Sequence, residues 1–254
     1  QSFTGTASPD DGGWWLHVRA IDDAGNCGGS VSYGPFWIDT TAPPAPGTVV
    51  SPSHDGGVTN DPTIDVEWGP SSAGTGAPIA GYRFDFWSGA VPPACSALTG
   101  NSAGTSASSP ALGEGDWYLS VCAVDGAGNE SPVTTGGPYT IDTSGPTGLL
   151  VASTSHALAT WSSAGDVDFA FSGAIDPNGV AGYSIAFDQA AATVPDSTPE
   201  QAGTTFTGTA SPDSPDWYLH VRACDSAGNC SAAVHAGPYW IDTGSPSAPG
   251  PLTS

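Results

Sequence analysis

The stretch "WYLHVRACDSAGNC", residues 217–230, gathers side chains that often carry chemistry in proteins. It holds a histidine, an arginine, an aspartate and two cysteines, a mixture suited to acid–base catalysis or to metal binding. The pattern recurs as "WWLHVRAIDDAGNC" from Trp14 and as "WYLSVCAVDGAGNE" from Trp117, where Ser120 stands in place of His220. A catalytic base would not be expected to be missing from one copy. We therefore expect packing or contact roles for these residues, and no enzyme activity.

The three copies are regularly spaced along the chain. Their first tryptophans lie 117 − 14 = 103 and 217 − 117 = 100 residues apart. The motif "I-D-T" repeats with the same spacing and places Asp39, Asp142 and Asp242 at corresponding positions. Self-similarity at a fixed period is the sequence signature of a repeat protein. The sequence therefore predicts a tandem array of units of roughly a hundred residues.

Composition indicates β-structure and turns. Of the 254 residues, 35 are Gly and 24 are Pro, and only 11% are charged, which disfavours helices. The chain has no lysine, and its 25 acidic residues against three arginines give a net charge of −22. This charge disfavours nucleic acid and anionic membrane surfaces as partners. No run reaches the ~20 apolar residues that span a bilayer, so we expect no membrane insertion in this segment.

The sequence of each repeat predicts a β-sandwich. Clear strand candidates in the middle unit are residues 64–68, 82–87, 117–124 and 139–143. Gly, Pro, Ser and Asn clusters separate these short aromatic and β-branched stretches, and about seven strands per hundred residues suit two packed sheets. Alternation points Leu119 and Val121 into the core. It points Ser120 and Cys122 to the outer surface.

Residues 64–84, "IDVEWGPSSAGTGAPIAGYRF", resemble the second and third strands of a fibronectin type III module. "AVDGAGNESP" from Ala123 is similar to that family's hairpin after the sixth strand. The pairing of "D-x-A-G-N" with "I-D-T" also resembles the tandem immunoglobulin-like repeats of bacterial surface proteins and large adhesins. The resemblance implies an extracellular rod of sandwiches, in which Ca²⁺ often stiffens the junctions. The expected fold class is all-β, with immunoglobulin-like or fibronectin type III-like sandwiches in an extended array.

The repeat spacing predicts the domain limits. Residues 1–43 are expected to be the C-terminal half of a sandwich, and residues 44–143 and 144–243 two complete sandwiches. Residues 244–254 are expected to be a linker and the start of a further repeat, because "PSAPG" there matches "PPAPG" at Pro44. Either the chain is a window cut from a longer array, or chains complete one another by strand exchange. We favour the window.

Calcium is the expected cofactor if there is one, and no cofactor is required. Aspartate and asparagine oxygens suit Ca²⁺, and a corner loop and the end of the last strand would converge if they lie at the same pole. The same residues also stabilise turns by bonding their own backbone, so the pattern does not require a metal. The candidate ligand sets are Asp22, Asn26 and Asp39, then Asp125, Asn129 and Asp142, and then Asp225, Asn229 and Asp242.

A stripe of aromatic, histidine and arginine side chains is expected to face outward from the sheets. It is interpreted as a contact surface for neighbouring repeats or for copies of the chain. The candidate interface residues are Trp15, His17, Arg19, Trp37, His220, Arg222 and Trp240.

The five cysteines indicate an oxidising compartment. Cys224 and Cys230 flank "DSAGN" on the two arms of a hairpin and are predicted to form a disulfide. Cys95 and Cys122, the two cysteines of the middle unit, are predicted to form a second one. Cys27 is left without a partner, because Ile21 occupies the position of Cys224.

Two functions remain open. The favoured one is a structural or adhesive spacer of a secreted or cell-surface bacterial repeat protein, including a segment of a filament or surface fibre. The alternative is a carbohydrate-binding accessory module of a secreted enzyme, in which exposed tryptophans stack on sugar rings. The expected partners are neighbouring repeats, copies of the chain, or a cell-surface or glycan ligand.

Overall fold

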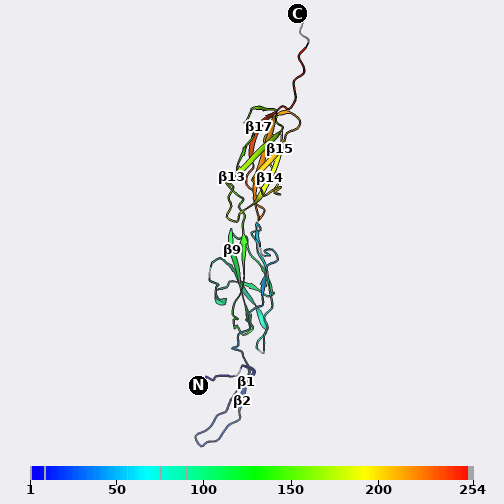
Figure 1. Cartoon of the computed structure of the whole chain (residues 1–254). Coiled ribbons are helices and arrows are strands. Elements are labelled where there is room, and N and C mark those ends of the chain that lie inside the picture. The colour runs from blue at the N-terminus through cyan, green and yellow to red at the C-terminus, as the bar shows by residue number, and fades with distance from the viewer. Residues whose placement is uncertain (1, 9, 56, 75, 90, 251–254) are drawn as a thin grey trace. The chain divides into compact units, whose positions relative to one another are not determined.

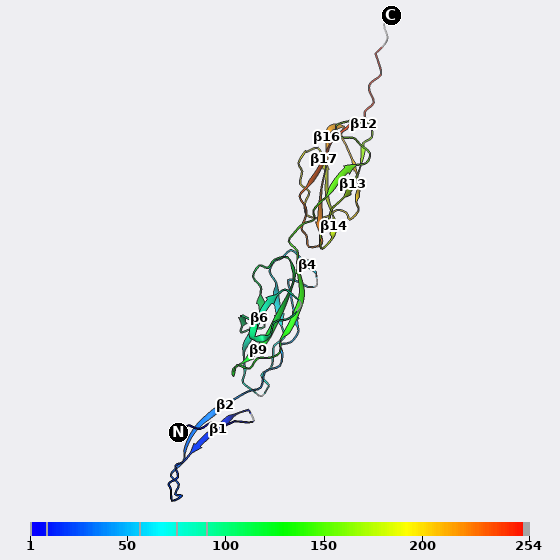
Figure 2. The same cartoon turned by 90° about the vertical axis from the view of Figure 1, so that its left-hand side faces the viewer.

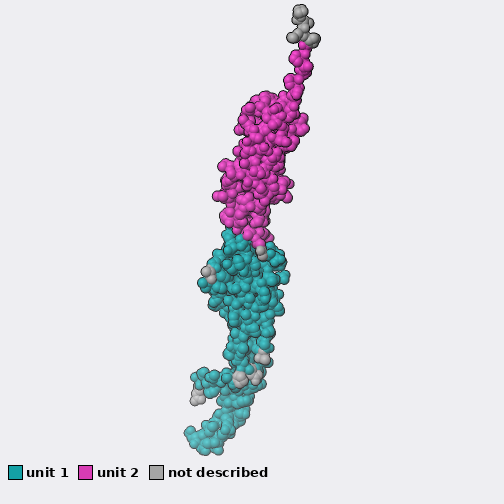
Figure 3. Space-filling view, viewed as in Figure 1, with its two compact units in different colours: residues 1–56, 63–140 teal, residues 57–62, 141–254 magenta. Residues whose placement is uncertain are grey.

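The computed structural model describes residues 2–8, 10–55, 57–74, 76–89 and 91–250. Contacts divide the chain into two compact units, residues 1–56 with 63–140 and residues 57–62 with 141–254 (Figure 3). Apart from the short 3-10 helix η1 (Cys95–Ala97), the regular elements of the described residues are all strands. The predicted all-β class is therefore confirmed. The predicted limits at residues 43, 143 and 243 remain predictions, and residues 251–254 of the last segment lie outside the described residues.

The first unit contains the two-stranded hairpin β1–β2 and one sandwich, the middle repeat. Its strands are β1 (Asp11–Val18), β2 (Val31–Ile38), β3 (Val49–Val50), β5 (Asp65–Trp68), β6 (Ile79–Trp87), β7 (Gly100–Ser102), β8 (Ser106–Ser108), β9 (Gly115–Asp125) and β10 (Thr134–Ile141). Strands β10, β9, β6 and β7 follow one another in one sheet, and β3, β5 and β8 form another. Figure 2 labels the hairpin strands β1 and β2 and the neighbouring sheet strands β6 and β9. The rings of Trp68 on β5 and Tyr82 on β6 lie 5.7 Å apart, so the two sheets share a core.

The second unit contains one sandwich, the last repeat of the chain (Figure 1). The strands of this sandwich are β11 (Leu150–Ser153), β12 (Trp161–Ser162), β13 (Asp166–Ser172), β14 (Val180–Asp188), β15 (Thr205–Thr209), β16 (Ser214–Asp225) and β17 (Val234–Ile241). The second unit also includes β4 (Val58–Thr59), which is in neither sheet of the sandwich. The strand orders are β11-β13-β15 in one sheet and β12-β17-β16-β14 in the other. One apolar cluster joins both sheets, because it includes Val167 and Phe169 of β13 as well as Leu219 and Val221 of β16.

The predicted inward face of the central strand is correct. Leu119 and Val121 of β9 are fully buried, as are Leu219 and Val221 of β16. Burial of such a side chain stabilises the folded state by about 1.5–3 kcal/mol. In the hairpin, Val18 occupies the corresponding position and is 54% exposed. The hairpin β1–β2 therefore presents to solvent a face that the sandwiches bury.

A glycine is required at one strand position in each repeat. Gly34, Gly137 and Gly237 have φ values of 148°, 110° and 150°, a region that other residues rarely adopt. A Cβ atom at these glycines would lie 2.7 to 2.8 Å from the carbonyl oxygens of Trp14, Trp117 and Trp217. The strand pairing of β16 with β17 is irregular between Trp217 and Leu219, at the level of this close approach. The glycine therefore permits a bulge that keeps the inward register on both sides.

Candidate functional site

The "D-x-A-G-N" loops form three corners with the same internal geometry. We name these corner A (Asp22–Asn26), corner B (Asp125–Asn129) and corner C (Asp225–Asn229). In each corner the aspartate Oδ1 accepts the backbone N–H of the asparagine at 2.8 to 2.9 Å. The aspartate Oδ2 accepts the asparagine side-chain amide at 2.9 to 3.0 Å. The aspartate side chain thus accepts the hydrogen bonds that close the turn, a role that a backbone carbonyl has in ordinary turns. This agrees with the interpretation of these residues as turn formers.

In corners A and B these hydrogen bonds favour the charged form of the aspartate. In corner A, the side-chain amide of Asn26 is the main cause of a lowered pKa of Asp22, and the backbone N–H of the same residue adds to it. In corner B, burial raises the pKa of Asp125, but the bonds from Asn129 outweigh this and the pKa is lowered. Donors that point at a carboxylate favour its ionised state. The carboxylates of Asp22 and Asp125 are therefore anionic hydrogen-bond acceptors above their lowered pKa values.

The asparagine amides of corners B and C make a further bond, to a residue far away in the sequence. Asn129 Nδ2 donates to the backbone carbonyl of Asp39 at 3.2 Å. Asn229 Nδ2 donates to the backbone carbonyl of Asp142 at 2.8 Å. Each corner is thereby tied to the residue that follows the last strand of the preceding repeat.

This arrangement corrects the predicted calcium ligand sets. Asp39 was expected beside corner A and Asp142 beside corner B, but Asp39 lies at corner B and Asp142 at corner C. The reason is the antiparallel hairpin: the corner joins two strands at one pole, and the second strand then carries the chain to the opposite pole. A strand of 8 residues such as β17 spans about 26 Å. The aspartate at its end, Asp242 after β17, cannot share an ion with its own corner.

Three carboxylates converge at corner C. Asp142, Asp176 and Asp225 each place an oxygen within 4.8 Å of the others, and Asp142 and Asp225 are 3% and 4% exposed. The amide of Asn178 donates to Oδ2 of Asp142 at 2.9 Å. The donors are hard oxygens of the kind Ca²⁺ prefers, but three carboxylates fall short of the six to eight oxygens that it usually takes. The residues fit Ca²⁺ in chemistry, and water or backbone oxygens would have to complete the shell.

Asp176 was missed by the sequence reasoning. It precedes the "VAGY" stretch that enters β14, and the corresponding position before "IAGY" in the middle repeat is Thr75. At corner B, the backbone N–H of Ala77 donates to Oδ2 of Asp39 at 2.6 Å. Aligning the two loops would have shown that only the last repeat carries a carboxylate there.

Two disulfides clamp the sandwiches. Cys224 and Cys230 are joined across corner C with their Cα atoms 4.1 Å apart. Cys95 of η1 and Cys122 of β9 are joined with their Cα atoms 5.8 Å apart. Cys27 is a free and exposed thiol, and it pairs with Ile21 across the base of corner A.

The predicted outer stripe is partly wrong. His17 and Arg19 are exposed on the hairpin and Arg222 is half-buried, but His220 is fully buried and therefore is not part of an exposed interface. The cause is the loop between β14 and β15, which covers this face. Arg222 Nη1 donates to the carbonyl of Pro195 in that loop at 3.2 Å. In the middle repeat, η1 and its disulfide bury Cys122 in the same way.

The tryptophans of the predicted stripe differ in exposure. Trp37 is 81% exposed and Trp15 is exposed as well, both on the hairpin. Trp240 is half-buried and pairs across strands with Trp161, which is 56% exposed, with ring centroids 5.6 Å apart. Trp161 was not among the predicted residues. It emerges only because β12 lies parallel to β17.

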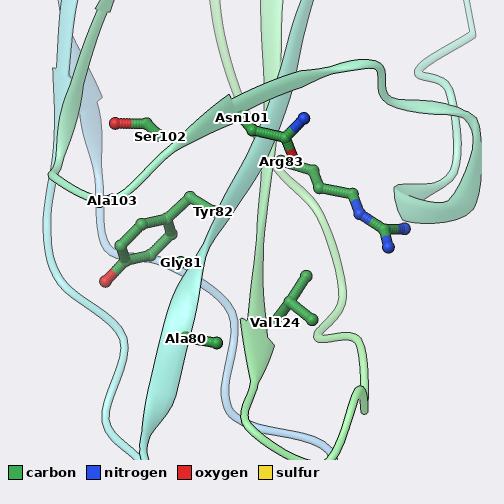
Figure 4. Close-up of a pocket in the computed structure, with 8 residues that line it drawn as sticks. All are labelled: Ala80, Gly81, Tyr82, Arg83, Asn101, Ser102, Ala103 and Val124. Carbon is green, nitrogen blue, oxygen red and sulfur yellow. The ribbon is translucent and has the colours of Figure 1, made fainter.

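A shallow pocket of about 340 Å³ lies on the outer sheet of the middle repeat (Figure 4). Tyr82 and Arg83 of β6 and Asn101 and Ser102 of β7 are among the residues that line it. Arg83 forms an ion pair with Glu130 at the end of corner B. None of the eight lining residues is a histidine, cysteine, aspartate or glutamate, so the pocket offers no acid–base pair.

Among the described residues, no helix has the length and apolar character needed to cross a bilayer.

No protein-family model matches the chain. No curated protein sequence matches it either.

Solved structures that it resembles include fibronectin(III)-like modules of Clostridium thermocellum CbhA, at 16% identity and a TM-score of 0.37, covering 74% of this chain and 91% of that chain. A central fibronectin-III array of RIM-binding protein matches at 15% identity and a TM-score of 0.27, covering 82% and 72%. Chitinase ChiA74 from Bacillus thuringiensis matches at 16% identity and a TM-score of 0.30, covering 80% of this chain and 30% of the chitinase. Fibronectin type III-like modules are thus among the structures that the chain resembles.

Proposed function

We propose that the chain is a non-catalytic structural spacer of an extracellular or cell-surface repeat protein. The observation that carries this proposal is the double use of the corner asparagines. Asn129 and Asn229 each close their own loop and also hold the carbonyl oxygen of an aspartate that follows the preceding repeat. Side chains engaged in this way serve the joining of repeats, and their amide N–H donors are not available to a substrate.

The cysteine chemistry supports an extracellular location. Two disulfides form within the described residues, and disulfides persist mainly in oxidising compartments. The Cys95–Cys122 bond links residues 27 apart, and the Cys224–Cys230 bond locks a corner. A spacer outside the cell must resist unfolding and proteolysis, and both bonds restrict the unfolded chain.

An adhesive or filament-forming role belongs to the same proposal. The hairpin exposes Val31, Tyr33 and Trp37 on one two-stranded sheet, and exposed apolar patches of this kind mark contact sites. Neighbouring repeats or further copies of the chain are the proposed partners, with a cell-surface glycan as the other proposed ligand. Nucleic acid is not a proposed partner, because the net charge is −22.

Calcium is proposed as a stabilising ion at corner C. Asp142, Asp176 and Asp225 would hold it, and the bound cation would offset the repulsion between three nearby carboxylates. Corner A lacks an equivalent set because Asp39, the aspartate that was expected beside it, lies at corner B. No calcium is proposed there.

Single-molecule stretching of the chain between two handle domains tests the spacer role. We expect stepwise unfolding in which the disulfides shorten the released length, since residues 95–122 and 224–230 cannot extend. Reduction should lengthen both steps. Unfolding of the oxidised chain without a resolvable force peak would contradict a spacer that resists tension.

A carbohydrate-binding accessory role is the second candidate, and the Trp161–Trp240 pair favours it. The two rings lie at the sheet edge, and exposed indoles stack on sugar faces. Affinity electrophoresis on soluble polysaccharides tests this role, with Trp161→Ala compared with Trp37→Ala on the hairpin. Retardation lost only in Trp161→Ala would favour the accessory role, and no retardation of the wild type would remove it.

A further inference from the structure

The outer face of the last repeat holds three titratable side chains that the proposed function does not use. His220 on β16 is fully buried, and its Nδ1 lies 2.6 Å from Nδ1 of His235 on β17. The other ring nitrogen of His220, Nε2, makes no hydrogen bond and lies 3.4 Å from Oδ1 of Asp188 on β14. Because β14, β16 and β17 are neighbours in one sheet, the three side chains link three strands.

The other repeats place uncharged partners at these positions. In the hairpin, His17 corresponds to His220, and its Nδ1 lies 2.7 Å from the hydroxyl of Ser32. In the middle repeat, Ser120 corresponds to His220 and accepts the indole N–H of Trp87 at 2.9 Å. The last repeat is therefore the copy in which this cross-strand position carries two imidazoles and a carboxylate. In the other copies one hydrogen-bonded pair at this position is enough to connect the strands, so the structure alone does not require two histidines and an aspartate.

The 2.6 Å contact dictates where the protons lie. A neutral imidazole has one donor and one acceptor nitrogen, so with both rings neutral the short contact requires one proton between the two Nδ1 atoms. If His220 supplied it, the lone pair on its Nε2 would face the carboxylate of Asp188. If His235 supplies it, His220 keeps its proton on Nε2 and directs it at Asp188. The second assignment, inferred from the network, avoids the repulsion.

We propose that Asp188, His220 and His235 form a proton-dependent clasp on the last repeat. The first added proton enters at the exposed ring of His235 and converts the shared bond into a charge-assisted one. The buried His220 lies between this cation and the Asp188 carboxylate, so the added charge is compensated. A second proton would place the N–H groups of two imidazolium ions against each other, and the clasp would open.

Asp188 stays charged over the range that matters. Burial raises its pKa, but the backbone N–H of Ala190, the hydroxyl of Thr193 and the ring of His220 outweigh this and the pKa is lowered. The carboxylate is therefore an anion wherever an imidazole takes up a proton.

The other polar groups around His220 do not take the place of Asp188 as its charged partner. The ring of Tyr218 on the same strand stacks at 6.3 Å. Arg222, next along this face, is occupied by the carbonyl of Ser231 at 2.9 Å and by loop carbonyls. Asp196 of the covering loop accepts from Ser184 at 3.3 Å and from the backbone N–H of Thr198. Asp188 is the carboxylate that lies at the histidine pair.

The sign of the effect follows from linkage. The folded clasp holds the first proton, whereas the unfolded chain has no such pair, so acidification through the imidazole range strengthens the last repeat. This contribution is absent at alkaline pH. It is lost again when a second proton is forced onto the pair. The stability of the last repeat should therefore pass through a maximum on the weakly acidic side of neutrality.

Hydrogen exchange of the whole chain, read by mass spectrometry at about pH 8, 6 and 4, tests the clasp. The strands β16–β17 are compared with β9–β10, the internal reference that lacks the histidines. After correction for intrinsic exchange, the opening equilibrium of β16–β17 should fall about tenfold from alkaline to weakly acidic pH and rise again below it. The matched variants are His235→Ser, which reproduces the hairpin pair, and the double variant His220→Ser with His235→Thr, which places the serine and threonine of the middle repeat at the two histidine positions. Both should remove the maximum.

Imidazole nitrogen NMR of the wild-type chain gives a second readout that does not depend on the variants folding. The expected result is two coupled titrations with an Nδ1 resonance typical of a shared hydrogen bond. Two independent titrations would overturn the clasp, and so would a pH response that is the same in β16–β17 and β9–β10 or unchanged in His235→Ser.

Discussion

Asn229 donates its side-chain amide to the backbone carbonyl of Asp142 at 2.8 Å, and 142 is the residue that follows the last strand of the preceding repeat. The same asparagine also donates to Oδ2 of Asp225 at 3.0 Å. One side chain therefore closes a turn and holds the connection that enters the repeat. The corresponding bond of Asn129 reaches Asp39 at 3.2 Å, so the device is used twice.

The first prediction concerns this amide. Asn229→Asp should lower the stability of the last repeat by about 1–3 kcal/mol, because it removes the donor to two acceptors and places a second carboxylate beside Asp225. Hydrogen exchange of residues 214–241 measures the effect. Ser226→Ala, at an exposed position of the same corner, is the control and should change little. Equal effects of the two substitutions would show that the amide has no joining role.

The second prediction separates the two disulfides. The Cys95–Cys122 bond closes 27 residues and the Cys224–Cys230 bond closes 6, so chain entropy favours the former. Replacing Cys95 and Cys122 by serine should lower the free energy of unfolding of the middle repeat by about 3.5 kcal/mol. Replacing Cys224 and Cys230 by serine should lower that of the last repeat by about 2 kcal/mol. Denaturant unfolding followed by exchange of each repeat measures both. A larger loss at corner C would mean that native geometry, and not loop closure, sets the contribution.

The third prediction concerns acid. The pKa values of Asp22, Asp125 and Asp213 lie below the ordinary value of 3.8, so their hydrogen bonds contribute stability that is fully present above that pH. It is lost as pH falls through the lowered values, because the folded state must then release these bonds on protonation. Thermal unfolding at a series of acid pH values should show this loss as a fall in melting temperature with decreasing pH. Asp125→Asn should flatten it for the middle repeat alone, and an unchanged slope there would contradict the assignment.

The fourth prediction is weak calcium binding at corner C. Titration calorimetry should show a dissociation constant of about 10⁻⁴ to 10⁻³ M, typical of extracellular modules. Asp176→Asn should abolish it by removing one of three carboxylates, whereas Asp216→Asn, exposed elsewhere on the last repeat, should leave it unchanged. Absence of binding to the wild type, with no shift in thermal stability on adding a chelator, would remove calcium from the proposed function.

Much of the architecture could be predicted from residue order. The 103 and 100 spacings located the equivalent strands, and alternation identified Leu119 and Val121 as core residues. These features are local or periodic, so they are visible without coordinates. Alternation failed for His220 and Cys122, because it describes two faces of a strand and does not reveal what a distant loop covers.

The grouping of the polar residues was decided by tertiary structure. The sequence by itself indicated that the corner aspartates and asparagines stabilise local turns, and in each corner the aspartate does bond the backbone N–H of the asparagine four residues later. It did not determine that Asp142 joins corner C, or that His220 meets both His235 and Asp188, because those contacts depend on strand direction and sheet order. Antiparallel pairing carries the end of a hairpin to the pole opposite its turn and brings side chains from three strands together. Such neighbours are set by the fold in space and not by their separation along the chain.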